Sequence, residues 1–268
     1  MVLTVAGWNL DGWHTITDAQ VKLLDRSEAH LLLAQEVTPA SLYRLRAAGW
    51  GGVGALELLP DDHVERAGIR PRFGCAVLTR GPVTVMGVEV LVRAPSPVRT
   101  LAADVEIAGL TVHVVSAALP PGSKWGRAAK QGQAEELNAH LRGRTGPALV
   151  GMDRNGPKFE RWASDDTVWW PEDAPWFFGN GAEHGLTDVL NTFHERHPEH
   201  AEARRRDRPD EPRAVSYVER RARPPIARRY DVILASNHWR VLNVIYDYGG
   251  AIEAGSDHAL VTCRLEPW

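Results

Sequence analysis

The chain has 268 residues, 44% of them hydrophobic and 24% charged, and a formal net charge of -3 at pH 7. This composition is ordinary for a globular protein, and no stretch approaches the roughly 20 apolar residues that a membrane-spanning helix needs. The weak negative charge argues against a protein that coats nucleic acid by bulk attraction. Because no basic segment precedes the short apolar run at the N-terminus, we expect no signal peptide, a cytoplasmic location and no membrane partner.

Short runs rich in Val, Ile and Leu predict strands, and apolar residues at helical spacing predict helices. In chain order the predicted elements are a strand at 2–8, a helix at 17–29, a strand at 30–36, a helix at 38–48, strands at 73–80, 83–92, 101–107 and 111–118, a helix at 125–142, and strands at 148–152, 230–236 and 258–265. Thr17 and Thr38 are the cap candidates of the first two helices. We therefore expect one mixed α and β domain over residues 1–268, with enough strands for two sheets.

Positive charge is concentrated in one late segment. Residues 202–229 contain ten Arg against five Asp or Glu, a local balance of +5 that leaves -8 for the remainder of the chain. Frequent Pro and scarce apolar residues predict an exposed Arg/Pro-rich loop at about 195–228. The triplet Arg204, Arg205 and Arg206 within it either faces solvent or binds substrate phosphates.

Polar side chains stand at the ends of several predicted strands. Some of them follow the last residue of an apolar run, and others precede the first residue of one. Because antiparallel neighbours end where the adjacent strand begins, we expect these groups to meet at one rim of the sheets. The groups are Asn9, Glu36, Asp153, Asn155, Asp231, Asp257 and His258. If residues 149–155 stay extended, the alternation of side chains puts Asp153 and Asn155 on the same face.

Short motifs at these positions resemble a known family. They are WNL at 8–10, QE at 35–36, DRN at 153–155, HGLTDVL at 184–190, RYD at 229–231 and SDH at 256–258. Their order and approximate spacing resemble the endonuclease/exonuclease/phosphatase superfamily, which includes the deoxyribonuclease I-like nucleases, over nearly the whole chain. The resemblance implies an α+β fold, a four-layer α/β/β/α sandwich of two packed, mainly antiparallel sheets flanked by helices.

The same resemblance implies a metal-dependent phosphoester hydrolase. Mg²⁺, or Mn²⁺ in its place, would be held by Glu36 and Asn9, with Asp257 also near the ion. A few hard oxygen ligands suit Mg²⁺, which keeps several waters and completes its coordination with substrate phosphate.

The resemblance also implies roles for the remaining polar groups. Asp153 would orient and deprotonate the attacking water, and Asn155 would brace that water or a phosphate oxygen. His258, oriented by Asp257, would contact the phosphate as charge builds on it, while Asp231 would support the metal or the leaving group. Positioned charges and dipoles of this kind supply most of the catalysis in phosphoryl chemistry.

One position departs from the family pattern. Ala118 stands where the family commonly presents a histidine, and a methyl group offers neither a proton nor a hydrogen bond. His113 is a poor substitute because it lies five positions away on the same strand and faces the opposite side. His14, Lys124 and His184 are the stand-ins that loops could supply.

A Trp-rich stretch follows Asp153 in the sequence. It contains Trp162, Trp169, Trp170 and Trp176. These side chains either stack on nucleobases or pack over the core, and Trp170 is the candidate for substrate contact.

We therefore expect a Mg²⁺-dependent phosphodiesterase or nuclease-like hydrolase. Its substrate would be nucleic acid or a small phosphate ester. The acidic body favours one alternative, a phosphatase or phosphodiesterase of a small soluble phosphate ester. Ala118 favours another, a nucleic-acid or nucleotide-binding relative that has lost catalysis.

Overall fold

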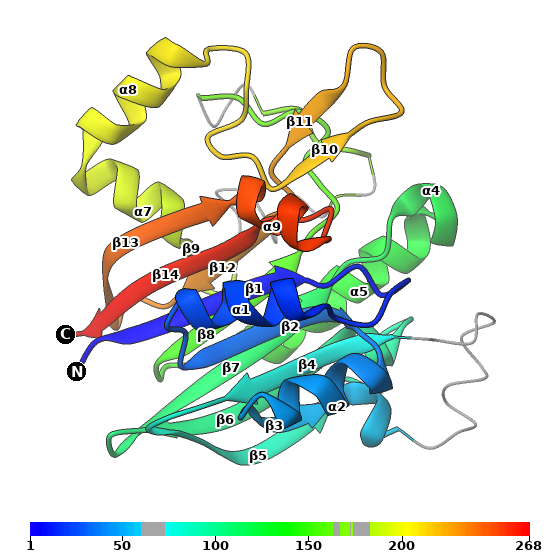
Figure 1. Ribbon diagram of the computed structural model, residues 1–268, viewed down its shortest axis with the longest axis vertical. Helices are drawn as coiled ribbons and strands as arrows, with labels where there is room; N and C mark the ends of the chain where they lie inside the picture. The colour runs from blue at the N-terminus through cyan, green and yellow to red at the C-terminus, as the bar shows by residue number, and fades with distance from the viewer. Residues whose placement is uncertain (60–72, 163–166, 172, 174–182) are drawn as a thin grey trace.

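Two β-sheets pack face to face between outer helices in the computed structural model, which describes residues 1–59, 73–162, 167–171, 173 and 183–268 (Figure 1). Within these residues each large sheet has six strands. The first has the order β13 (Trp239–Asp247), β14 (Leu260–Pro267), β1 (Leu3–Asn9), β2 (Leu31–Val37), β4 (Gly74–Thr79) and β3 (Gly51–Gly54). The second has the order β5 (Val83–Val90), β6 (Thr100–Ile107), β7 (Leu110–Ala118), β8 (Ala148–Asp153), β12 (Asp231–Ala235) and β9 (Thr187–Asp188).

Neighbouring strands are antiparallel except for one parallel pair in each sheet. The parallel pairs are β1 with β2 and β7 with β8. The predicted four-layer α/β/β/α sandwich of mainly antiparallel sheets is therefore confirmed. All nine predicted strands are present, with ends shifted by at most two residues.

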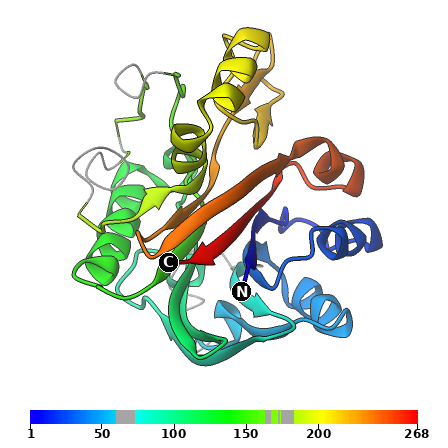
Figure 2. The ribbon, with the colours of Figure 1, turned by 90° about the vertical axis from the view of Figure 1, so that its left-hand side faces the viewer.

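Helices cover both outer faces of the sandwich (Figure 2). On the first sheet lie α1 (Asp18–Arg26), α2 (Pro39–Ala47) and α9 (Tyr248–Ala254), and on the second lies α5 (Arg127–Leu141). The helix α7 (Val189–Arg196) packs at the edge of the sandwich against β13 and β12, where Val189 and Phe193 join the central core. Thr17 caps α1 through a capping box with Gln20, and Thr38 accepts a hydrogen bond from the Ser41 amide at the start of α2. Side-chain oxygens at these positions satisfy amide groups that a helix leaves unpaired, which is why both helices begin where the sequence predicts.

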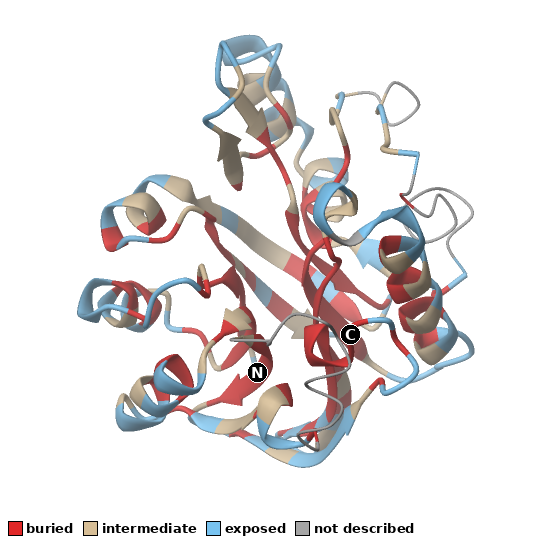
Figure 3. Ribbon diagram, turned by 90° about the vertical axis from the view of Figure 1, so that its right-hand side faces the viewer, coloured by how far each residue is buried: buried red, intermediate tan, exposed pale blue. Residues whose placement is uncertain are grey.

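The buried apolar residues form three clusters, one between each two neighbouring layers of the four-layer sandwich. Figure 3 shows where the buried residues lie. The central layer fills the space between the sheets and includes Leu33 and Ile233. A second layer joins the first sheet to α1, α2 and α9, and a third joins the second sheet to α5 through residues such as Leu137. Burial of this apolar surface is the main source of stability in such a sandwich.

The segment predicted as an exposed loop at about 195–228 is partly regular structure. Residues Pro198–Asp207 form α8, and Tyr217–Glu219 and Ile226–Arg228 pair as the hairpin β10–β11. The expectation of a continuous loop was wrong because Pro198 begins a helix at its first turn, where proline is tolerated. The long strand β13 and the short helix α4 (Gly122–Trp125) were also not predicted. None of the described helices is long and apolar enough to cross a membrane.

The strand directions bring the polar strand ends together. Asp153 at the end of β8 lies directly opposite Asp231 at the start of β12, and Ala118 at the end of β7 is the parallel neighbour of Asp153. In the other sheet, Asn9 at the end of β1 lies beside Gln35 of β2. Strand ends of both sheets therefore meet at one rim of the sandwich, as predicted.

Candidate active site

A cavity of about 1290 Å³ opens at this rim. The structure brings most of the predicted site residues to its walls. These are Asn9, Glu36, Asp153, Asn155, Trp170, Asp257 and His258. Asp231 lies directly behind His258, to which it is hydrogen-bonded.

Asp153 is the centre of a hydrogen-bond cluster on the cavity floor. Its Oδ2 accepts hydrogen bonds from Asn9 Nδ2 at 3.2 Å and from Asn155 Nδ2 at 3.0 Å, and its Oδ1 accepts one from the Asn155 amide at 2.9 Å. Burial raises the pKa of Asp153, although the nearby His258 opposes that increase. A buried carboxylate with a raised pKa is a better proton acceptor than an exposed one.

Asn155 reaches Asp153 by a different route from the predicted one. The strand ends at Asp153, and Asn155 has φ of +47°, so the chain turns back instead of staying extended. Lys130 of α5 stabilises this turn, because its ammonium group donates a hydrogen bond to the Asn155 carbonyl at 2.8 Å. Lys130 is buried and forms an ion pair with Asp173, which is also buried. Asn tolerates the left-handed region better than most residues, and the Lys130 contact secures it there.

Asp231 and His258 form a buried ion pair on the same floor. Asp231 Oδ2 lies 2.8 Å from His258 Nδ1, and both side chains are almost fully buried. Burial alone would lower the pKa of His258, but the Asp231 carboxylate outweighs it, and the pKa of His258 rises to about 10. The imidazole is therefore protonated at neutral pH and presents Nε2–H as a donor.

The prediction that Asp257 orients His258 was wrong. Asp257 Oδ1 lies 4.0 Å from His258 Nε2, and the Asp257 side chain is 47% exposed. Asp231 of β12 lies at Nδ1 of His258, whereas Asp257 lies nearer the opposite nitrogen, Nε2, so Asp231 and not Asp257 orients the imidazole. Asp257 lies on the wall of the cavity instead.

Glu36 enters the cavity from an irregular point of β2. The pairing of β2 with β4 shifts register between Ala34 and Val37, and Glu36 has φ of +54°. Such a bulge re-aims a side chain at the cost of backbone strain, a device that is common next to active sites. Glu36 Oε2 accepts from the Gly12 amide at 3.2 Å, and Oε1 lies 3.8 Å from Arg99 Nη2. Burial raises the pKa of Glu36, while Arg99 acts in the opposite direction.

The other residues of the motifs support these side chains. Trp8 Nε1 donates to the His258 carbonyl at 3.0 Å, and Ser256 Oγ donates to the Asn9 carbonyl at 3.0 Å, so the SDH segment is tied to β1. Gln35 Nε2 donates to Ser116 Oγ and to the Gly151 carbonyl, both at 3.1 Å, and so links the two sheets. Sequence reasoning predicted the motifs but not these supporting roles.

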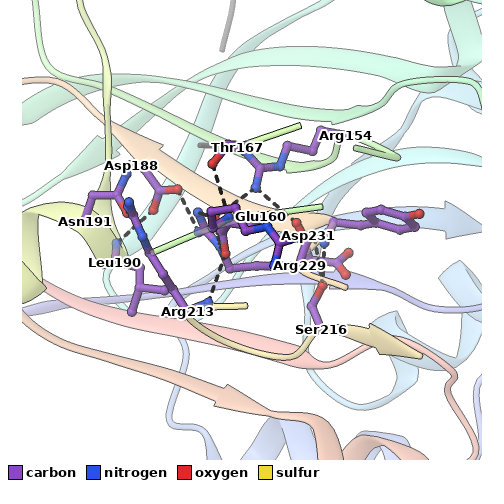
Figure 4. A network of polar contacts seen from close by, with 12 residues as sticks. Arg154, Glu160, Thr167, Asp188, Leu190, Asn191, Arg213, Ser216, Arg229 and Asp231 are labelled. Atoms are coloured by element: carbon purple, nitrogen blue, oxygen red, sulfur yellow. Dashed lines mark hydrogen bonds and ion pairs between the residues drawn. The ribbon is translucent and has the colours of Figure 1, made fainter. Parts of the chain in front are cut away.

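A buried charge network lies beside the ion pair (Figure 4). Arg229 of the RYD motif pairs with Glu160 and with Asp188 of the HGLTDVL segment. Arg154 of the DRN motif donates to the Arg229 carbonyl at 3.0 Å. Tyr246 donates to the Asp231 carbonyl at 3.0 Å. Residues that are far apart in the sequence thereby fix the segments that carry Asp153 and Asp231.

The cavity walls are basic and aromatic. Lys124, Arg127 and Lys158 line it, together with Trp169 and Trp170. Lys158 Nζ lies 5.3 Å from the ring centre of Trp170, a cation–π contact. Trp176 lies outside the described residues.

The Arg triplet does not reach this cavity. Arg204 Nη2 pairs with Glu211 Oε2 at 3.3 Å and faces a second, smaller cavity near α7. Arg205 and Arg206 are exposed on α8, and neither lines the candidate active site. Some arginines of the Arg/Pro-rich segment form ion pairs within the protein, as in the half-buried pair Arg204–Glu211 and the pair of buried Arg228 with Glu219.

Ala118 is buried beside Asp153 and belongs to the central apolar layer. Of its three proposed stand-ins, Lys124 lines the cavity, whereas His14 and His184 are not among its lining residues. His113 faces the outer side of the second sheet, as predicted, where it contacts His140 of α5.

No protein-family model matches the chain, and no curated protein matches it. Solved structures match it along nearly its full length. D. rerio TDP2 complexed with a single strand DNA product has a TM-score of 0.64 at 16% identity, over 99% of this chain and 99% of that one. An AP endonuclease from Archaeoglobus fulgidus has a TM-score of 0.65 at 19% identity, over 97% of this chain and 98% of that one. An endonuclease/exonuclease/phosphatase from Bacteroides vulgatus has a TM-score of 0.62 at 16% identity, over 100% of both chains. The chain therefore has the fold of the endonuclease/exonuclease/phosphatase superfamily, which its sequence motifs predicted.

Proposed function

We propose that the protein is a divalent-metal-dependent phosphodiesterase that cleaves nucleic acid by attack of water on phosphorus. The observation that carries this proposal is the meeting of two buried clusters on one cavity floor. Asp153 with Asn9 and Asn155 forms one cluster, and the Asp231–His258 ion pair forms the other. The first supplies a proton acceptor and the second a cationic donor, and both face the same cavity.

The residues of the cavity fit a hard divalent cation. Ligand atoms of Asp153, Asp231 and His258 lie within 4.8 Å of one another. A protonated imidazole has no lone pair for a metal, however, so the raised pKa of His258 argues against that set. Glu36 and Asn9 line the same cavity and offer oxygen atoms, and the buried Glu36 carboxylate near Asp153 favours a cation there. We assign Mg²⁺ or Mn²⁺ to Glu36 and Asn9. Once bound, the ion would polarise the phosphoryl oxygen and neutralise its growing charge.

The protein groups divide the remaining work. Asp153 accepts the proton of the attacking water, and Asn9 and Asn155 hold its carboxylate in place. His258 donates from Nε2 to a phosphoryl oxygen, and Asp231 keeps the imidazole charged and oriented. Fixed donors of this kind stabilise charge that develops in the transition state.

Lys124 is the residue that we assign in place of the missing histidine at position 118. It lies in the short helix α4, a few residues after the end of β7, and it lines the cavity. An ammonium group at this wall would stabilise the departing oxygen. The Ala118 methyl group cannot do so.

The walls of the cavity favour a polynucleotide over a small ester. Lys124, Arg127 and Lys158 supply positive charge for more than one phosphate, and Trp169 and Trp170 supply surfaces for base stacking. The D. rerio TDP2 structure contains a single strand DNA product, and this neighbour also supports nucleic acid as the substrate.

An activity screen with added Mg²⁺ tests the proposal. Single- and double-stranded DNA, RNA, nucleotides and a nitrophenyl phosphodiester would be compared, with EDTA and with Asp153→Asn as controls. We expect hydrolysis of a polynucleotide that both controls abolish. Hydrolysis of a small ester alone would overturn the substrate class, and binding without turnover would overturn the enzymatic activity.

A further inference from the structure

Two histidines face each other on the outer side of the second sheet, away from the cavity. His113 lies on β7 and His140 in the last turn of α5, and their side chains are 10% and 9% exposed. The two Nε2 atoms are 3.0 Å apart. His113 is five residues from Ala118 along β7, which places the pair roughly 16 Å from the active-site end of the strand.

Each imidazole has a carboxylate beside its Nδ1 atom. Asp104, the direct neighbour of His113 on β6, has Oδ1 at 2.8 Å from His113 Nδ1. Glu89 of β5 has Oε2 at 4.0 Å from His140 Nδ1. The Asp104 carboxylate keeps a proton on His113 Nδ1 and leaves the lone pair on His113 Nε2, which is the usual arrangement around metal-bound histidines. Glu89 is too far from His140 for a hydrogen bond, so in the metal-free protein the His140 proton lies on Nε2 and is donated to His113 Nε2.

The separation of the two Nε2 atoms suits a shared ion. Two imidazole nitrogens at 2.0–2.1 Å from a tetrahedral Zn²⁺ would be about 3.3 Å apart. At the right angles of a tetragonal Cu²⁺ or Ni²⁺ site, similar bond lengths would give about 2.9 Å. The observed distance of 3.0 Å lies between these values, so small side-chain movements accommodate either geometry.

Both imidazoles keep a lone pair at neutral pH. Burial lowers the pKa of His140 to about 4, helped by the positive charge of Arg144, and burial also lowers the pKa of His113. A cationic group already approaches the pair, because Arg144 Nη2 lies 3.5 Å from His140 Nε2. Arg144 is exposed and follows the end of α5, so its side chain can move away from the pair.

We propose that His113 and His140 form a binding site for a divalent transition-metal ion such as Zn²⁺, Cu²⁺ or Ni²⁺, with Asp104 and Glu89 orienting the imidazoles. On binding, both Nε2 atoms become ligands, the His140 proton moves from Nε2 to Nδ1 beside Glu89, and water fills the remaining positions. No net proton is released. Imidazole ligands suit these ions, whereas Mg²⁺ prefers oxygen, so this site differs in metal preference from the one at Glu36. The ion would fasten the end of α5 to β7.

Calorimetric titration with Zn²⁺ in saturating Mg²⁺ tests this proposal on the intact chain. His113→Gln and His140→Gln should each weaken Zn²⁺ binding at least 10-fold, on the order of the effect that removal of a metal-site partner has. Arg144→Gln should strengthen binding, because it removes a competing positive charge. His14→Gln is the matched control, since it removes an exposed histidine outside the pair.

Asp104→Asn keeps both imidazoles and should weaken Zn²⁺ binding by about 10- to 100-fold. This variant tests the proposal even if a histidine variant does not fold. Circular dichroism would confirm the fold of each variant. With Cu²⁺, the electron paramagnetic resonance spectrum should show two coupled nitrogens that disappear in His140→Gln. Absence of Zn²⁺ binding, or equal affinity in the native protein and both histidine variants, would overturn the proposal.

Discussion

Asp231, the first residue of β12, holds His258, which lies just before β14, by a hydrogen bond of 2.8 Å between Oδ2 and Nδ1. Asp231 belongs to the second sheet and His258 lies two residues before β14 of the first, so this ion pair links the two sheets at the cavity floor. Asp231 Oδ1 has no hydrogen-bond partner within the described part of the chain. The ion pair with His258 therefore uses only one oxygen of Asp231, Oδ2.

Replacement of Asp231 tests whether the charge on His258 matters. Asp231→Asn removes the carboxylate that raises the pKa of His258 to about 10, so the imidazole should lose its proton at a lower pH. We expect kcat to fall by about 10²-fold or more, and activity to decline at a lower pH than in the native protein, because the protonated form is the donor. The pH dependence of kcat measures both effects. Asp257→Asn is the control, and an equal effect of the two variants would contradict the assigned pairing.

Two triple variants distinguish the basic surfaces. Replacement of Lys124, Arg127 and Lys158 by Gln should weaken binding of single-stranded DNA and reduce its salt slope by about 0.7 for each phosphate that is no longer neutralised. Replacement of Arg204, Arg205 and Arg206 by Gln should leave the slope unchanged, because the triplet does not line the candidate active site. Fluorescence anisotropy across a salt series measures both slopes. A flatter slope for the Arg variant alone would assign DNA binding to α8.

Position 118 and Lys124 can be tested with two classes of ester. Lys124→Met should slow hydrolysis of an unactivated diester by about 10²-fold and hydrolysis of a nitrophenyl diester much less, because the phenolate needs little help to leave. Ala118→His in that background should restore part of the rate, with Ala118→Leu as a control for crowding of the buried position. Equal slowing of the two esters by Lys124→Met would rule out a role at the leaving group.

The histidine pair also predicts how stability depends on pH. Native His140 has a pKa of about 4, below its ordinary value of 6.5, so the unfolded chain takes up a proton first as the pH falls. The contribution of His140 to the free energy of unfolding is fully present above pH 6.5 and is lost as the pH falls from 6.5 to about 4. The slope is at most about 1.4 kcal/mol per pH unit for each imidazole, and solvent screening lowers it. Urea unfolding in EDTA should show a weaker acid destabilisation for the double variant His113→Gln, His140→Gln, and an identical destabilisation would contradict the assignment.

Local sequence pattern predicted most of the sandwich but not its irregular parts. The predicted strands alternate or are continuously apolar, whereas β13 mixes Arg240, Asn243 and Asp247 with apolar residues and gives no clear period. The turn at Asn155 depends on Lys130 and Asp173, and the orientation of His258 depends on Asp231. Partners that lie tens of residues away in the sequence decide such details, so motif order could predict the site residues but not their pairing.

The most direct test of the proposed reaction is hydrolysis of a labelled single-stranded DNA by native protein, Asp153→Asn and Glu36→Gln, each with and without Mg²⁺. Native protein with Mg²⁺ should cleave the strand, EDTA should abolish cleavage, and both variants should bind the DNA yet cleave it at least about 10³-fold more slowly. In Glu36→Gln, higher Mg²⁺ should restore part of the rate, whereas in Asp153→Asn it should not. Metal-independent cleavage, or a native rate in the folded Asp153→Asn variant, would contradict the proposed mechanism.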